Sequence, residues 1–250
     1  MRQLWRQIGD TFILLRACVR DARDIDWREA LRQCFIMGNR SFLFIAVVMG
    51  FTGGILVIQA AFQVRRQIGD LSIVGPAFLQ LMVREFGPTI VAMMVAARYG
   101  AGVSAELAAM RVSEQVDALR MSGAEAAPAL VAPRVIAGLV GMLPLVIYGT
   151  LIAYVSGGFA AQAAFGVSWH SYASTGMVDA VDVVVGLAKS VAFGVAVPLV
   201  ASQAGLAARG GSAGVGRATT RAVIASSLTV LALDFFLGAV GLALDGWGQG

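Results

Sequence analysis

Long apolar runs separated by short polar stretches dominate the pattern along this chain. A helix needs about 20 apolar residues to cross the roughly 30 Å of hydrocarbon in a bilayer. A transmembrane barrel would instead show segments of about ten residues with alternating polarity. The pattern therefore predicts an all-α integral membrane protein with about five transmembrane helices, at Phe42 to Phe62, Leu71 to Ala97, Leu130 to Val155, Val178 to Ala201, and Val223 to Leu244.

The second run is long for a straight span, and it contains two Gly-Pro pairs, Gly75-Pro76 and Gly87-Pro88. Proline cannot donate a backbone hydrogen bond and clashes with the preceding turn of a helix. We expect a kinked or partly re-entrant helix here.

Residues 1–40 precede the first span and differ from it in pattern. Ile8, Phe12, Leu15 and Val19 recur at helical spacing among several arginines, which predicts an amphipathic helix lying in the lipid interface. The alternative is a helix docked on the protein's own cytoplasmic face. The apolar run from Phe12 to Leu15 is too short for a secretory signal. The membrane domain is expected to follow this N-terminal segment, over residues 41–250.

Composition agrees with a membrane protein, since 58% of the residues are hydrophobic and 14% are charged. Basic residues near the span ends are retained on the cytoplasmic side. They are frequent before the first span, between the second and third, and between the fourth and fifth, whereas the outer loops hold only Arg65 and Arg66. The N-terminus is therefore expected in the cytoplasm and the C-terminus outside. Nucleic-acid binding is not indicated, because the basic excess marks the membrane's cytoplasmic surface.

Four ionisable residues lie inside the apolar runs: Arg84, Glu85, Lys189 and Asp234. Charges at that depth are costly and commonly mark a functional site. Arg84 offers a cation that could hold a phosphate group. For Lys189 and Asp234 a purely structural ion pair is the alternative. Besides a transporter subunit, an ion-coupled secondary transporter with a proton on Glu85 or Asp234 and a structural scaffold both remain open.

A polar stretch from Ala105 to Met121 has the pattern of a short amphipathic helix. Ser104 is placed to start it as a capping residue. Such a helix, presented between two spans, is either a docking surface for a soluble partner or a helix packed under its own bundle. Its polar side carries Glu106, Arg111, Glu114 and Asp117.

Several familiar kinds of site are not expected in this sequence. Cys18, Cys34 and His170 have no companions at metal-ligand spacing, and a disulfide is not expected in a cytoplasmic segment. The sequence has no Gly-x-x-x-x-Gly-Lys-Ser/Thr phosphate loop, and the Gly-rich run Arg209 to Gly214 is better explained as a turn before the fifth span. We expect no catalytic residue, metal or cofactor in this chain, and we do not expect it to be a nucleotide-hydrolysing subunit.

Several sequence blocks resemble the MlaE (YrbE-type) permeases of the Mce lipid-transport systems. The likeness covers roughly Phe42 to the C-terminus and rests on the order in which the blocks occur. They are Arg84-Glu85-Phe86-Gly87-Pro88, Ala97-Arg98-Tyr99-Gly100-Ala101, Ala105-Glu106-Leu107, Met110 to Gln115, Pro133-Arg134, Gly166 to Trp169, Ser212 to Val223, Ser226-Ser227, and Leu233-Asp234-Phe235.

The resemblance implies an ABC-type permease of the inner membrane that works as a homodimer. Its partners would be a cytoplasmic ATPase, which binds the ATP, and an MCE-domain protein outside that exchanges phospholipid with it. The family's coupling helix corresponds to residues 105–122. Arg84 matches a position near the lipid headgroup, Glu85, Lys189 and Asp234 match charged membrane positions, and the wall of the lipid cavity corresponds to Leu56, Gln63, Val64 and Gln67.

Overall fold

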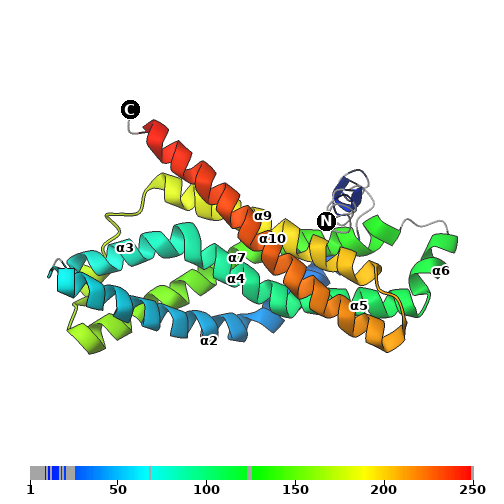
Figure 1. Ribbon diagram of the computed structural model, residues 1–250, viewed down its shortest axis with the longest axis horizontal. Coiled ribbons are helices and arrows are strands. Elements are labelled where there is room, and N and C mark those ends of the chain that lie inside the picture. Colours follow the sequence, from blue (N-terminus) through cyan, green and yellow to red (C-terminus); the bar gives the residue numbers. More distant parts are fainter. Residues whose placement is uncertain are drawn as a thin grey trace. The chain divides into compact units, whose positions relative to one another are not determined.

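The computed structural model describes residues 9, 11, 13–16, 18, 20, 26–67, 69–122 and 126–248, and every regular element among them is helical (Figure 1). Among these described residues, five helical stretches are long and apolar enough to cross a membrane, which confirms the predicted class and number. The elements are α2 (Trp27–Gln67), η2 (Leu71–Ile73), α3 (Val74–Leu81), η3 (Met82–Phe86), α4 (Gly87–Val95), η4 (Ala96–Gly100), α5 (Ala101–Val112), α6 (Gln115–Met121), α7 (Ala126–Phe165), α8 (Trp169–Tyr172), α9 (Ala180–Leu206) and α10 (Gly211–Gly248).

The spanning helices extend beyond the apolar runs that predicted them. Helix α2 begins at Trp27, well before Phe42, because Asp26 caps it: Oδ1 of Asp26 accepts from the backbone N–H groups of Arg28 at 2.9 Å and Glu29 at 3.3 Å. An apolar run thus marks the part of a helix that suits lipid, whereas polar caps set its ends.

The second span, Leu71–Val112, is a series of helical segments with two π-helical turns, η3 and η4. The turn η3 precedes Pro88, and Gly87 N–H bonds to the carbonyl of Met82, five residues back. Pro88 has no N–H to continue a regular ladder, which favours a wide turn there. Pro76, in contrast, lies in the first turn of α3, where proline is tolerated. Only the second Gly-Pro pair interrupts the helix.

The single helix predicted over Ala105 to Met121 is divided in two in the structure. Helix α5 continues directly from the second span to Val112, and α6 starts afresh at Gln115. Between them the Ser113 hydroxyl donates to the carbonyl of Ala109 at 2.9 Å, and Glu114 adopts a left-handed conformation with φ of 62°. Ser104 is buried within α5, so it does not cap a helix start.

The described residues between 9 and 20 are helical, in agreement with the expected N-terminal helix. Cys18 is buried against Val131, Ala132 and Leu199, and Leu14 and Leu15 pack on the same cluster. Part of the helix's apolar side therefore docks on α7 and α9. Ile8, Phe12 and Val19, which carried part of the amphipathic prediction, lie outside the described residues.

The chain divides into two compact units, and α2, α4, α7, α9 and α10 contribute residues to both. Unit 1 comprises residues 1–41, 92–142 and 191–232, and unit 2 comprises residues 42–91, 143–190 and 233–250. In unit 2, a Cβ at Gly53 would lie 2.1 Å from the carbonyl oxygen of Ala153. In unit 1, a Cβ at Gly138 would lie 2.1 Å from the carbonyl oxygen of Gly194. Each unit thus has helices in backbone contact, as small residues permit in membrane proteins.

A charged chain and an apolar cavity as the candidate functional site

Five charged side chains of unit 2 form a continuous series of ion pairs, which we call the charge chain. Arg84 pairs with Asp182, with Nη1 2.9 Å from Oδ1, and its Nε lies 3.8 Å from Oε1 of Glu85. Lys189 contacts Glu85 and also lies 2.9 Å from Oδ1 of Asp234. The signs alternate along the series Asp182, Arg84, Glu85, Lys189, Asp234.

The local fold explains how these residues meet. Arg84 and Glu85 lie in the π-helical turn η3, where the wide ladder presents two consecutive side chains to α9. Helix α9 approaches η3 closely at Gly186, where a Cβ would lie 2.2 Å from the carbonyl oxygen of Val83. Asp182 and Lys189 lie on either side of Gly186 along α9. A close backbone contact thus places one acid and one base of α9 beside the turn.

Asp182 is the member of the charge chain that the sequence did not single out. Its side chain is 2% exposed, and Oδ2 accepts from Nε2 of Gln80 at 3.0 Å and from the backbone N–H of Asp179 at 3.1 Å. In the sequence it stands near the start of the fourth apolar run, close to Asp179, and looks like part of the polar flank. Its spacing of seven residues from Lys189, two turns along one helix face, was the available signal.

The ion pair that was one alternative for Lys189 and Asp234 is present in the structure. Lys189 also contacts Glu85, and the Thr89 hydroxyl donates to Oδ1 of Asp234 at 2.8 Å. Lys189 is fully buried. A buried ammonium without carboxylates would be strongly unfavourable. Arg84, expected to offer a cation to a phosphate, is in contact with two carboxylates.

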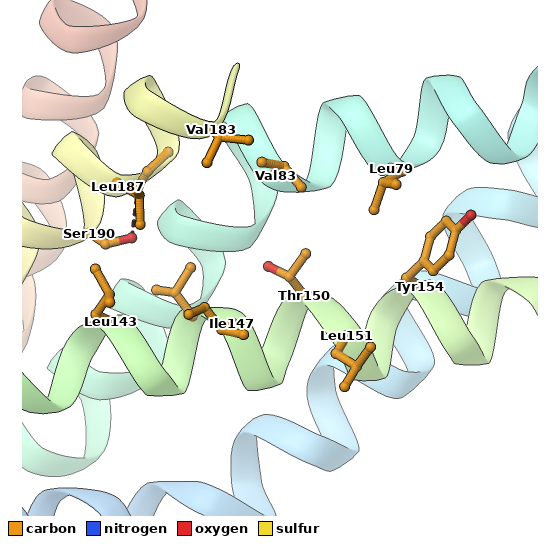
Figure 2. Close-up of a pocket in the computed structure, with 12 residues that line it drawn as sticks. Leu79, Val83, Leu143, Ile147, Thr150, Leu151, Tyr154, Val183, Leu187 and Ser190 are labelled. Atoms are coloured by element: carbon orange, nitrogen blue, oxygen red, sulfur yellow. Dashed lines mark hydrogen bonds between the residues drawn. The ribbon is translucent and has the colours of Figure 1, made fainter. Parts of the chain in front are cut away.

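An apolar cavity of about 320 Å³ lies in the same unit, between α3–η3, α7 and α9. Figure 2 shows the lining residues Leu79 and Val83 on α3 and η3, Ile147 and Leu151 on α7, and Leu187 on α9. The Ser190 hydroxyl is turned back to the carbonyl of Gly186, 2.8 Å away. The lining therefore offers hydrocarbon contact and suits an aliphatic chain.

The four positions expected to line a lipid cavity on α2 lie elsewhere. Leu56 and Val64 are half-buried, and Gln63 and Gln67 are exposed. Within the part of the chain that the structure describes, none of them lines the cavity of Figure 2.

The short helix α8 is held to α7 by a pair of tyrosines. The Tyr154 hydroxyl donates to the carbonyl of Tyr172 at 2.7 Å, and the Tyr172 hydroxyl donates to the carbonyl of Tyr154 at 3.1 Å. The rings are stacked with centroids 4.8 Å apart. Burial raises the pKa of the Tyr172 hydroxyl, since the phenolate would lose its hydration. His170 lies exposed in this same helix.

The residues predicted to form a docking surface in unit 1 divide into two ion pairs and one exposed acid. Arg111 pairs with Asp117 across the break between α5 and α6. Glu106 lies 3.0 Å from Nη2 of Arg134, which is almost fully buried. Glu114 is exposed at the break itself. Among the described residues, no group of three or more His, Cys, Asp or Glu is arranged to hold a metal ion.

Comparison with known proteins gives a consistent result. Residues 30–240 match the family described as permease MlaE. The chain is 32% identical to the intermembrane phospholipid transport system permease protein MlaE of Haemophilus influenzae, over 84% of this chain and 81% of that protein. It is 34% identical to a probable ABC transporter permease of Rickettsia felis, over 83% and 80%. It is 29% identical to the chloroplastic protein TRIGALACTOSYLDIACYLGLYCEROL 1 of Arabidopsis thaliana, over 94% and 68%.

Proposed function

Because the chain belongs to the MlaE permease family, we propose that it is the membrane subunit of an ABC-type transporter that moves phospholipid between the inner membrane and an MCE-domain protein. The match over residues 30–240 carries this proposal. The apolar cavity and the charge chain support it, since lipid handling needs room for hydrocarbon and polar groups for a headgroup.

ATP hydrolysis belongs to a separate cytoplasmic subunit, because the sequence lacks a phosphate loop of the Walker type. That ATPase docks on the segment from α5 to α6, through Glu106, Arg111, Glu114 and Asp117. Support comes from the exposure of Glu114 at the break between the two helices. The corner between α5 and α6, where Arg111 pairs with Asp117, would pass movement from the ATPase to the second span.

The working form is a homodimer in the inner membrane, with the N-terminus in the cytoplasm and the C-terminus in the periplasm. The distribution of arginines supports the orientation. Helices α2 and α10 leave large apolar side chains exposed, such as Phe51, Ile55, Leu228 and Phe235, and such a surface suits either lipid or a second copy of the chain. In the dimer, Leu56, Gln63, Val64 and Gln67 line a lipid cavity with Arg84 and Glu85 at the headgroup.

The test is ATP-dependent transfer of fluorescent phospholipid from vesicles containing the purified complex to an acceptor. Arg84→Ala should reduce transfer severalfold with the ATPase still bound. Arg84→Ala leaves the buried Asp182 without its ion-pair partner inside a membrane span. The double variant Arg84→Ala/Asp182→Asn is therefore better, because it removes both charges together.

Arg65→Ala is the matched control, because Arg65 is exposed at the end of α2; transfer should continue at the normal rate. A complex that retains its ATPase and transfers lipid normally without Arg84 would refute the role of that residue. A chain that purifies folded with no ATPase, and transfers no lipid when one is supplied, would refute the proposed function.

A further inference from the structure

The apolar cavity of Figure 2 is complete within one copy of the chain. Its volume is about 320 Å³, and its lining residues all belong to unit 2. An apolar cavity of about 150 Å³ is already large enough to take up benzene, and pockets for small ligands begin at about 300 Å³. Because the cost of an empty apolar cavity rises with its volume, a cavity of this size favours an occupant.

The lining restricts the chemistry of that occupant. Eight of the twelve lining residues are Leu, Val or Ile, and no charged side chain is among the twelve. The Ser190 hydroxyl donates to the carbonyl of Gly186, and the Tyr154 hydroxyl donates to the carbonyl of Tyr172. The protons of both hydroxyls are therefore already used within the protein. The part of a ligand that enters this cavity is hydrocarbon.

The opening of the cavity is marked by those lining residues that are exposed. On α7 these are Ile147 and Leu151, each 57% exposed. On α9 they are Val183 and Leu187, which are 42% and 40% exposed. Both helices are long and apolar enough to span a membrane. Bilayer hydrocarbon, and not water, therefore reaches an opening between these two helices.

The length of the cavity agrees with the same kind of ligand. Its lining extends along α7 from Leu143 to Tyr154. At the rise of an α-helix this stretch is about 17 Å long, which is about half of the roughly 30 Å of hydrocarbon in a bilayer. Half of the hydrocarbon thickness is the depth that the tails of one leaflet cover. The cavity is thus long enough for one extended acyl tail.

We propose that each copy of the chain binds one acyl tail of a bilayer lipid in this cavity, and that the tail enters between α7 and α9. The site differs from the lipid cavity proposed for the dimer, because within the described residues it contains none of the α2 positions assigned to that cavity. It goes beyond the proposed function, since it requires only the membrane-spanning fold.

The bound tail lies against the contact that assembles the charge chain. Val83 of η3 and Gly186 of α9 both line the cavity, and a Cβ at Gly186 would lie 2.2 Å from the carbonyl oxygen of Val83. A tail in the cavity packs on both sides of this contact. It therefore supports the position of η3 against α9.

The test uses the full chain in phosphatidylethanolamine vesicles, in which a small fraction of the lipid carries a diazirine group midway along one acyl tail. Irradiation should label Val146 and Ser190, because these lining residues are 8% and 2% exposed and lipid outside the cavity does not reach them. Labelling is mapped by mass spectrometry of peptides. Labelling of Phe236, 65% exposed on α10, reports contact with the surrounding bilayer.

Leu151→Trp places a bulky ring at the opening. It should lower the labelling of Val146 and Ser190 by about tenfold, because the ring competes with the tail for the same space. Labelling of Phe236 should not change. Ile147→Trp should act in the same way, and provides a second variant if Leu151→Trp does not fold.

Val140→Trp is the matched control, because Val140 is also 57% exposed on α7 but does not line the cavity; it should keep the wild-type labelling. A wild type labelled at Phe236 but at neither Val146 nor Ser190 would overturn the inference. So would wild-type labelling of Val146 and Ser190 in both folded tryptophan variants of the opening.

The source of the tail is tested by repeating the labelling with the ATPase bound, with and without ATP. A tail from a bilayer lipid should give equal labelling in both conditions. Labelling of Val146 and Ser190 that is lost during ATP hydrolysis would show that the cavity holds transported lipid, and would overturn the proposal of a bilayer lipid. The transfer assay tests the transport function separately, so the two proposals can fail independently.

Discussion

The two units of the chain place their charges differently. In unit 2 five charges lie within membrane-spanning helices and contact one another, and the most buried, Lys189, contacts two acids. In unit 1 most charged side chains are exposed, as at Arg98, Arg217 and Arg221, although these arginines also lie in helices long enough to span a membrane. A buried charge needs a partner, whereas an exposed charge gains little from one.

Arg134 shows that a buried charge is paired in unit 1 as well as in unit 2. It belongs to unit 1 but is almost fully buried, and it pairs with Glu106 and donates to the carbonyl of Leu130. The comparison therefore predicts that substitutions of buried charges are severe in either unit and that substitutions of exposed ones are mild.

The largest effect is expected at Lys189. Lys189→Met leaves Glu85 and Asp234 facing each other without the ammonium between them, and should destabilise the fold by about 3–5 kcal/mol. Thermal unfolding of the purified chain in detergent measures it. Arg221→Met, at an exposed position of unit 1, should change stability by no more than about 0.5 kcal/mol. Equal losses in the two variants would contradict the comparison.

A smaller effect is expected where α9 contacts η3. Gly186→Ala forces a methyl group against the carbonyl of Val83 and should cost about 1–3 kcal/mol by overpacking. In unit 1, Gly216→Ala in α10 meets no atom within 4 Å and should stabilise the helix by about 0.5–1 kcal/mol. The same unfolding assay measures the two changes in stability, which should have opposite signs. A destabilised Gly216→Ala variant would contradict this prediction.

For the exposed Glu114 of unit 1, we expect a substitution to change binding of the ATPase and to leave the stability of the fold almost unchanged. Glu114→Lys reverses an exposed charge at the break between α5 and α6 and should reduce co-purification of the ATPase severalfold, with the unfolding temperature unchanged. Glu114→Gln, which removes the charge without reversing it, should have an intermediate effect. Full recovery of the ATPase with Glu114→Lys would exclude this contact.

The smallest effect is expected at Asp70, which is exposed before η2. Hydrogen bonds from the Ser72 backbone N–H and hydroxyl lower the pKa of the Asp70 carboxyl. Since the pKa of Asp70 is lower in the folded than in the unfolded chain, its ionised carboxylate stabilises the fold above the unfolded value of about 3.9, and this stabilisation is lost as pH falls through the folded value. Asp70→Asn should therefore make the unfolding free energy less dependent on pH in the acidic range. The same acidic pH dependence in Asp70→Asn and the wild type would show that Asp70 does not contribute to it.

The apolar runs were sufficient to predict the spanning helices, because a bilayer imposes a minimum length on any helix that crosses it. They could not predict where helices end, since Asp26 caps α2 far from the apolar run. Nor could they predict the break at Ser113 and Glu114, because a left-handed glutamate has no reliable sequence signal.

Four of the five members of the charge chain could be identified from their depth in apolar runs alone. Asp182 could not, because it stands near a run's polar start and only the fold places it beside Arg84. The alternation of charges likewise arises where η3, α9 and α10 contact one another. It could not be predicted from the positions of Glu85, Lys189 and Asp234 in the sequence.

The most direct measurement is a double-mutant cycle on Arg84 and Asp182, using Arg84→Met, Asp182→Asn and the two together in the unfolding assay. If charges in the spans exist as mutual pairs, each single variant should be markedly destabilised and the double variant should recover part of the loss. The coupling should lie between about 0.5 and 3 kcal/mol. Losses that simply add would contradict the account, because they would show that neither charge needs the other.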